Sequence, residues 1–286
     1  MENNMNDNFA VFILTHGRPE NVITYKTLER AGYTGKIYII IDNEDETSKK
    51  YYDKFGDKVI MFDKIEISRT FDEADNFNDR RSIVYARNAC FEIAKNLDIE
   101  YFLQLDDDYT NFNFRMDASF GYVHKTIANI NPILEAFLDF YKNTTIKSVA
   151  MAQGGDFIGG EHNGIQKSSN RKRKCMNSFF CSTKRPFKFV GRINEDVNTY
   201  THKASTGHIF ITCPSVALEQ KQTQSNKGGM TDIYLENGTY NKSFYTIIFQ
   251  PSSVKINLMG IINRRLHHRI NWTNTVPNII EEKYKK

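Results

Sequence analysis

Three consecutive aspartates, Asp106 to Asp108, are the residues of this sequence best suited to chemistry. They directly follow the apolar run 101–105 (YFLQL), which is typical of a buried strand. Adjacent carboxylates repel one another unless a cation or solvent compensates, and hard oxygen ligands suit Mg²⁺ or Mn²⁺. Such an ion would neutralise a departing diphosphate. A solvated acidic turn is the alternative interpretation, but the position at the end of a strand favours a metal site.

The elements that must position these aspartates follow an α/β pattern. Two buried strands, 9–14 and 36–41, flank a helix from about 19 to 30, which is a βαβ unit. We expect further strands at 59–62, 101–105 and 149–152, and helices at 81–97 and 127–141. Ligands of open α/β sheets bind at the carboxyl ends of the strands. Asp42 ends the second strand there, where it would accept a hydrogen bond from a ribose or base, or cap a turn.

The amino-acid composition of the sequence changes at residue 154. Residues 154–192 are rich in Gly, Asn, Ser, Lys and Arg and have little periodicity, and strands resume at 208–212, 244–249 and 254–258. Long loops without regular structure are uncommon unless they are functional. We therefore expect one domain over residues 1–286. Within it, residues 154–192 would be an insertion on the side of the acceptor, the second substrate, and residues 216–286 a C-terminal extension that completes the site.

Residues 163–194 contain cations and aromatic rings but no acidic residue. Cations bind phosphates and rings stack on bases, so this composition favours a nucleic-acid acceptor, although a solvated loop is the alternative. A target base inside a duplex would have to be flipped out. The candidate acceptor- or DNA-binding residues are Arg171, Lys172, Arg173, Lys174, Phe179 and Phe180. Asp156 lies between two Gly-Gly pairs and is a candidate sugar or acceptor contact.

Glu195 and Asp196 are adjacent acids, and a positioned carboxylate can act as a general base that takes a proton from a hydroxyl group. Asp196 is our candidate and Glu195 is the near alternative, while the other interpretation is a pair of acids that stabilise a helix N-terminus.

Composition narrows the class of protein. Hydrophobic residues make up 40% and charged residues 25% of the chain, which is ordinary for a soluble protein. The net charge of +4 is too small to establish a nucleic-acid partner. Four cysteines without a CxxC pair favour a reducing compartment. The polar start and the absence of a membrane-length apolar run predict a cytoplasmic protein without membrane insertion.

Five motifs, in order, resemble those of GT-A glycosyltransferases. They are Thr15-x-x-Arg18, Asp42, Ala86-Arg87-Asn88, Leu105-Asp106-Asp107-Asp108 and Gly191-Arg192-Ile193-Asn194-Glu195-Asp196. The resemblance covers roughly residues 9–215 and implies a Rossmann-like mixed sheet. The motifs HGRPEN and LDDDY make the chain most similar to the TET-associated glycosyltransferases of bacteriophages. Those enzymes are thought to add sugars to hydroxymethylated pyrimidines in phage DNA.

The resemblance also implies roles for individual residues. Thr15 and Arg18 would contact the nucleotide, Asp42 would bind its base or ribose, and Arg87 would face the donor. Asp106 and Asp108 would contact ribose and Mn²⁺ or Mg²⁺. Asp107 would be a further donor-binding residue, although its presence leaves open which pair of the triplet binds the metal. A further metal ligand would come from His267 or, by slight preference, His268. The implied donor is a UDP-sugar, UDP-glucose or UDP-N-acetylglucosamine. The implied acceptor is 5-hydroxymethylcytosine, or another hydroxymethylpyrimidine, in phage DNA.

Three other functions fit parts of the pattern. A sugar nucleotidyltransferase shares the fold but usually has a glycine-rich loop where this chain has the single Gly17. A glycosyltransferase acting on a glycan, lipid or protein would share the donor site. A non-catalytic nucleic-acid-binding protein would explain the basic stretch but not the aspartates. The sequence leaves the donor sugar, the stereochemistry of transfer and the oligomeric state open.

Overall fold

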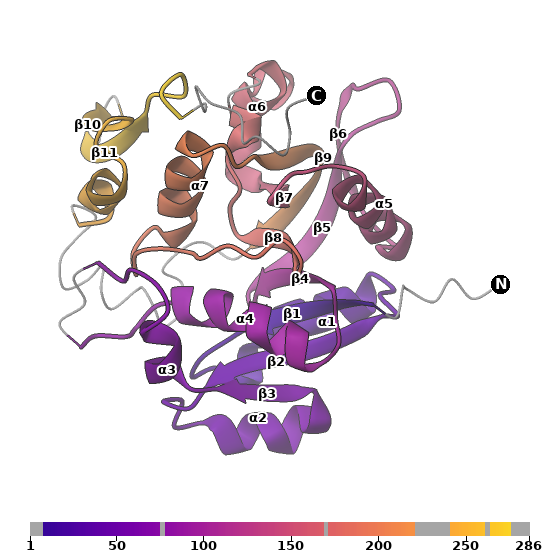
Figure 1. Cartoon of the computed structure of the whole chain (residues 1–286). Helices are drawn as coiled ribbons and strands as arrows, with labels where there is room; N and C mark the ends of the chain where they lie inside the picture. Colours follow the sequence, from indigo (N-terminus) through magenta and orange to yellow (C-terminus); the bar gives the residue numbers. More distant parts are fainter. Residues whose placement is uncertain (1–7, 75–77, 169–170, 221–240, 261–263, 276–286) are drawn as a thin grey trace.

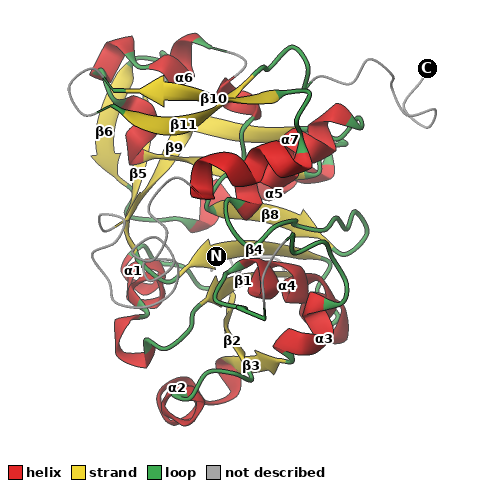
Figure 2. Ribbon diagram, turned by 90° about the vertical axis from the view of Figure 1, so that its left-hand side faces the viewer, coloured by secondary structure: helices red, strands yellow, loops and turns green. Residues whose placement is uncertain are grey.

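The computed structural model describes residues 8–74, 78–168, 171–220, 241–260 and 264–275 (Figure 1). Its strands form a five-stranded sheet, a four-stranded sheet and a two-stranded hairpin. Figure 2 shows the five-stranded sheet in the lower half of the molecule and the other two above it.

The five-stranded sheet has the order β3-β2-β1-β4-β8. Its strands are β1 (Phe9–Leu14), β2 (Lys36–Asp42), β3 (Val59–Phe62), β4 (Tyr101–Asp106) and β8 (Ser178–Ser182). The first four run parallel, and β8 pairs antiparallel with β4. The carboxyl ends of β1, β2 and β4 therefore meet at one edge, which is where this architecture places ligands.

Both faces of this sheet are buried, as the continuous apolar strands predict. On β1, Phe9, Val11 and Ile13 belong to one core, while alternate residues of the same strand face a second core. The connecting helices are α1 (Ile23–Arg30), α2 (Ser48–Phe55), α3 (Lys64–Ser68) and α4 (Val84–Asn96), with one-turn 3₁₀ segments at Pro19–Asn21 and Gly56–Lys58. After α1, Gly32 adopts φ +70°, a conformation that ends helices and favours glycine.

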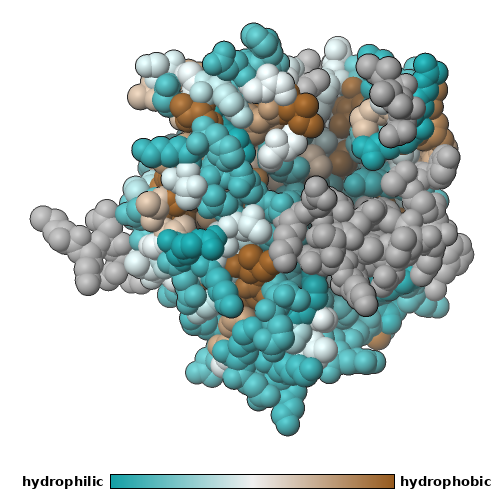
Figure 3. Space-filling view, turned by 180° about the vertical axis from the view of Figure 1, so that it is seen from behind, coloured by the Kyte–Doolittle hydropathy of each residue, from teal (hydrophilic) through white to brown (hydrophobic). Residues whose placement is uncertain are grey.

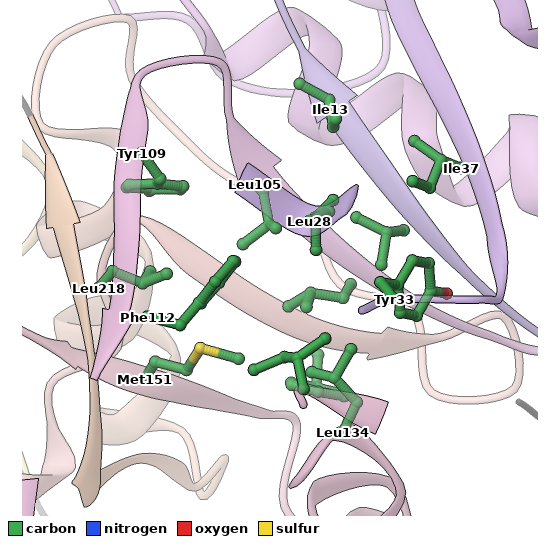
Figure 4. Close-up of a cluster of buried hydrophobic side chains, with 14 of the residues drawn as sticks. Ile13, Leu28, Tyr33, Ile37, Leu105, Tyr109, Phe112, Leu134, Met151 and Leu218 are labelled. Carbon is green, nitrogen blue, oxygen red and sulfur yellow. The ribbon is translucent and has the colours of Figure 1, made fainter. Parts of the chain in front are cut away.

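The four-stranded sheet has the order β6-β5-β9-β7. Its strands are β5 (Tyr109–Met116), β6 (Tyr122–Thr126), β7 (Ser148–Gln153) and β9 (Phe210–Gln220), and α5 (Asn131–Lys142) precedes β7. Side chains of β5, β7, β9 and α5 meet those of β1, β4 and α1 in the first core (Figure 4). The two sheets thus share one hydrophobic interior.

After β7 the chain returns to the five-stranded sheet as β8, and after β9 it forms the two-stranded hairpin. Short turns at Gly154–Phe157, Gly160–His162, Gly164–Lys167 (α6) and Arg171–Arg173 precede β8. The later elements are α7 (Glu195–Ser205), a helix over 241–249, β10 (Val254–Met259) and β11 (Arg265–Ile270). None of the helices in the described residues is long and apolar enough to cross a bilayer. The face in Figure 3 is mostly hydrophilic, with apolar residues in small groups.

The structure corrects three expectations. The segment 154–192 is not wholly irregular, because it contains β8, a strand of the main sheet. The C-terminal extension does not begin at residue 216, because residues 216–220 complete β9. Residues 244–249 are helical and not a strand. Tyr245 and Phe249 lie one helical turn apart and pack on Ile193, so tertiary contacts override the β propensity of this aromatic, β-branched run.

Candidate active site

The three aspartates at the junction of β4 and β5 alternate in exposure. Asp107 is buried and accepts hydrogen bonds from Thr15 Oγ1 at 2.6 Å and from Arg18 Nη2 at 2.9 Å. Asp106 and Asp108 are partly exposed. Both carboxylate oxygens of Asp107 are thus engaged by the loop after β1, whereas Asp106 and Asp108 are the two members of the triplet with partly exposed side chains.

Arg87 of α4 links the aspartates to the Glu-Asp pair of α7. Its guanidinium donates to Asp106 Oδ1 at 2.9 Å and to Glu195 Oε1 at 3.0 Å, and its side chain is 2% exposed. The same cation lies over the ring of Phe179, 4.8 Å from the centroid, and 5.9 Å from that of Phe189. A buried charge is costly unless it is paired, so these contacts explain how the protein holds Arg87 inside.

The carboxylates around Arg87 affect one another. Burial raises the pKa of Asp106 to about 6; Arg87 opposes this shift, while Asp108 and Glu195 add to it. The three acidic groups are therefore close enough for their charges to interact, and one cation does not fully compensate them. A divalent ion would complete the neutralisation.

A second polar cluster lies where β1 and β2 end. His16 Nδ1 lies 2.8 Å from Asp42 Oδ2, and Lys64 Nζ donates to Asp42 Oδ1 at 3.1 Å. Burial tends to raise the pKa of Asp42, but the bonds from His16 and Lys64 outweigh it and lower the pKa below its usual value. The Gly17 N–H donates to Asp45 at 2.7 Å, which closes the β1 loop onto the β2 loop.

Sequence analysis missed two residues that shape this cluster. Asp45 holds Gly17, and the Tyr51 hydroxyl accepts the Arg18 N–H at 2.8 Å and lies 2.9 Å from Thr15 Oγ1. The spacing of Asp45 three residues after Asp42 could have indicated a turn. No local pattern in the sequence could have indicated Tyr51, because its hydroxyl reaches the site only through the packing of α2 in the folded chain.

The two candidate bases occupy different surroundings. Glu195 faces Arg87, whereas Asp196 is buried and its Oδ1 accepts the N–H of Val197 at 2.7 Å. Burial, reinforced by Glu195, raises the pKa of Asp196 to about 7. A carboxylate with a pKa near neutrality is suited to general-base work. Lys174, which pairs with Asp156, also interacts electrostatically with Asp196.

Other expected acceptor residues are dispersed. Phe179 and Phe180 are 1% exposed on β8 and pack in the two cores, so the expectation that they stack on bases is not what the structure shows. Lys172 is half-buried, and Arg173 donates to the Trp272 carbonyl at 2.6 Å. The side chain of Arg171 lies outside the described residues.

The carboxylate ligands at the end of β4 suit Mg²⁺ or Mn²⁺. Asp106 and Asp108 offer carboxylate oxygens, and these ions commonly use one or two carboxylates with substrate phosphates. Within the described residues, no three His, Cys, Asp or Glu side chains gather to hold a metal by themselves. His268 thus does not complete a three-ligand site here. Burial lowers its pKa to about 4, and its Nδ1 is buried without a hydrogen-bond partner in the described part of the chain.

Comparison with known proteins decides the family. Residues 9–229 match the TET-Associated Glycosyltransferase family, well over half of the chain. The chain belongs to this family. The protein is therefore a glycosyltransferase. The strand order and strand directions confirm the expected α/β fold class with a Rossmann-like mixed sheet. No curated protein matches the glycosyltransferase significantly.

Among solved structures, the glycosyltransferase is similar to glucosyl-3-phosphoglycerate synthase from Mycobacterium tuberculosis, crystallised with Mn²⁺, uridine diphosphate and phosphoglyceric acid. The two are 8% identical over 92% of this chain and 86% of that chain, with a TM-score of 0.45. A similarity this low carries no argument about the site. What the site can do follows from its own residues, which combine acidic oxygens, the buried guanidinium of Arg87 and a carboxylate, Asp196, whose pKa lies near neutrality.

Proposed function

We propose that this glycosyltransferase transfers a sugar from a UDP-sugar to a hydroxyl acceptor with the help of Mn²⁺ or Mg²⁺, and that the acceptor is 5-hydroxymethylcytosine in DNA. The observation that carries the proposal is the bridge from Asp106 through Arg87 to Glu195. This bridge joins the strand-end carboxylates to the Glu-Asp pair, so a donor diphosphate and an acceptor base would share one site.

The donor side has groups suited to a nucleoside diphosphate. Arg18 Nε and Arg87 Nη1 are buried N–H groups without a hydrogen-bond partner among the described residues. Such groups are costly to leave unpaired, and phosphate oxygens would satisfy them. Asp42, beside the half-exposed His16, would bind the ribose or base. Thr15 would act through Asp107, which it orients together with Arg18.

A metal ion would be held by Asp106 and Asp108 and would neutralise the leaving diphosphate. On the acceptor side, Asp196 would take the proton of the attacking hydroxyl, a role worth about 10²–10⁴-fold in rate. Glu195 would keep Arg87 in place. The DNA acceptor is supported by the family and by the basic stretch around Lys172 and Arg173, which matches a phosphate backbone.

The test is a transfer assay on a duplex that contains 5-hydroxymethylcytosine. The protein is incubated with UDP-glucose or UDP-N-acetylglucosamine and Mn²⁺, and the digested nucleosides are analysed by mass spectrometry. We expect a hexose or N-acetylhexosamine mass on the modified base, and no product with EDTA. Asp196→Asn should lose at least about 100-fold in rate while it still binds UDP. Glu195→Gln should weaken both transfer and UDP binding, because it removes the negative charge that pairs with Arg87.

Duplexes with plain cytosine serve as the matched acceptor control. Product on both duplexes would show that the hydroxymethyl group is not the acceptor. Full turnover by Asp196→Asn would remove this residue from the role of base, and full turnover in EDTA would exclude the proposed ion.

A further inference from the structure

The β10–β11 hairpin carries positive charge on one face. Its register places Lys255 opposite Arg269, Asn257 opposite His267 and Met259 opposite Arg265. Alternate residues of a strand point to the same side, so these six side chains share one face. Lys255, Arg265 and Arg269 are exposed, and only Met259 among the six is apolar. We call this surface the basic face of the hairpin.

Within the described ranges, no acidic side chain pairs with the cations of the basic face. Residues 237–280 include five Lys and Arg and no Asp or Glu. Among the residues that the structure describes, Lys255, Arg265 and Arg269 form no ion pair with a carboxylate. Like charges directly across an antiparallel pair are destabilising, as for Lys255 and Arg269. An anionic partner would convert this repulsion into attraction.

The opposite face of the hairpin anchors it to the protein. Val254 is buried, and Ile270 packs against the second core together with Trp272 just beyond the strand. A two-stranded hairpin is marginally stable by itself, so this packing holds it in place. Met259 is the one apolar member of the basic face, so this face has little of the mixture of cations and large apolar groups that favours a lipid surface.

The hairpin is also connected to the Glu-Asp pair. Ser243 of the helix over 241–249 donates to the Leu266 carbonyl at 2.9 Å, and Asn194 donates to the Lys242 carbonyl at 2.6 Å. Trp272 stacks on Tyr200 of α7 at 6.0 Å, and Arg173 lies over the Trp272 ring at 5.3 Å. These contacts fix the basic face relative to the start of α7 (Figures 1 and 2).

We infer that the basic face of the β10–β11 hairpin binds the phosphate backbone of duplex nucleic acid and thereby presents the acceptor to the Glu195–Asp196 end of α7. A two-stranded ribbon fits the width of a DNA groove, and Asn257 and His267 offer hydrogen-bonding groups between the cations. The inference deepens the proposed function and rests on it for the identity of the acceptor, but binding can be measured without transfer.

The test measures binding of the full-length protein to a fluorescent, unmodified 25-base-pair duplex by anisotropy over a series of salt concentrations. The variant is Lys255→Gln with Arg269→Gln. If both cations contact phosphates, the slope of log affinity against log salt should fall by about 2, since each contact contributes about 0.9. The matched control is Lys49→Gln with Lys50→Gln, which removes the same charge from the exposed surface of α2, at the far end of the molecule.

The variant should fold, because both residues are exposed and their removal relieves repulsion; circular dichroism checks this. Hydrolysis of the UDP-sugar without DNA should stay at the wild-type rate. An unchanged salt slope, or an equal loss in the α2 control, would overturn the inference. So would binding of the wild type to phosphatidylserine vesicles but not to the duplex. Salt-sensitive binding through the hairpin without sugar transfer to hydroxymethylated DNA would instead overturn the proposed function and leave the inference standing.

Discussion

At the scale of single residues, Arg87 organises the site. It is the buried cation between Asp106 and Glu195, and its guanidinium lies over the rings of Phe179 and Phe189. Sequence analysis predicted that Arg87 faces the donor, but not that it joins the two acidic motifs, because the partner lies 108 residues away along the chain.

We predict that Arg87→Ala lowers the free energy of unfolding by about 3–5 kcal/mol, because it leaves two carboxylates unpaired in a largely buried place. Urea denaturation followed by circular dichroism measures the change. The control is Arg30→Ala on the exposed side of α1, which should cost less than about 1 kcal/mol. Equal losses in the two variants would show that the Arg87 bridge contributes nothing beyond an ordinary surface contact.

The site residues predicted from contiguous sequence motifs lie close together, whereas a prediction that depended on tertiary pairing was wrong. The aspartate triplet and the Glu-Asp pair are contiguous motifs, and their elements bring them into one site. Phe179 and Phe180 were mistaken for a binding surface because apolar residues beside cations look the same in sequence whether they form an exposed loop or a buried strand. Only the pairing of β8 with β4 distinguishes the two cases.

At the scale of elements, the segment that leads into α7 is tightly confined. The Gly191 N–H donates to the Asp72 carbonyl at 2.8 Å, and Ser82 Oγ donates to the Arg192 carbonyl at 2.6 Å. Phe249, from the helix over 241–249, lies against Gly191 from the other side. The position of the Glu-Asp pair therefore depends on contacts from two distant segments.

Within this segment, Gly191 has no room for a side chain. It adopts φ +74°, and a Cβ there would meet Asn198 Nδ2 and the Phe249 ring at 2.5 Å each. We predict that Gly191→Ala lowers the free energy of unfolding by about 2–4 kcal/mol, from backbone strain and overpacking together. Thermal denaturation measures it. Gly155→Ala, where nothing lies within 4 Å, should be neutral to about 0.5 kcal/mol. A stable Gly191→Ala protein would mean that Phe249 moves aside freely.

The same segment should respond to acid through Asp79, which accepts bonds from Arg81 and Arg192. The Arg81 bond is the main cause that lowers the pKa of Asp79 to about 2. Because the pKa is lowered, these bonds stabilise the folded protein fully above about pH 4, the ordinary pKa of an Asp side chain. This stabilisation is lost as the pH falls towards 2. Asp79→Asn should therefore be less stable at pH 7 and lose less stability than the wild type between pH 4 and 2. Parallel stability curves for the two proteins would contradict this.

At the scale of the whole molecule, periodicity predicted the parallel sheet well, because β1, β2 and β3 are apolar runs whose bounds match the expected ones closely. It failed for β5, β6 and β11, which mix polar and apolar residues, and for the helix over 241–249. These elements take their conformation from neighbours that are distant in sequence, and a single sequence does not reveal such neighbours.

The junction of the two sheets has a consequence for how the chain can change length. Only Asp107 and Asp108 separate β4 from β5, and Tyr109 and Phe112 of β5 are buried in the first core. One residue inserted there would turn Phe112 and its neighbours to the opposite side and move the acids out of reach of their partners. We expect natural insertions and deletions to be excluded from residues 105–110, whereas the surface turns between β7 and β8 can be lengthened without disturbing either strand.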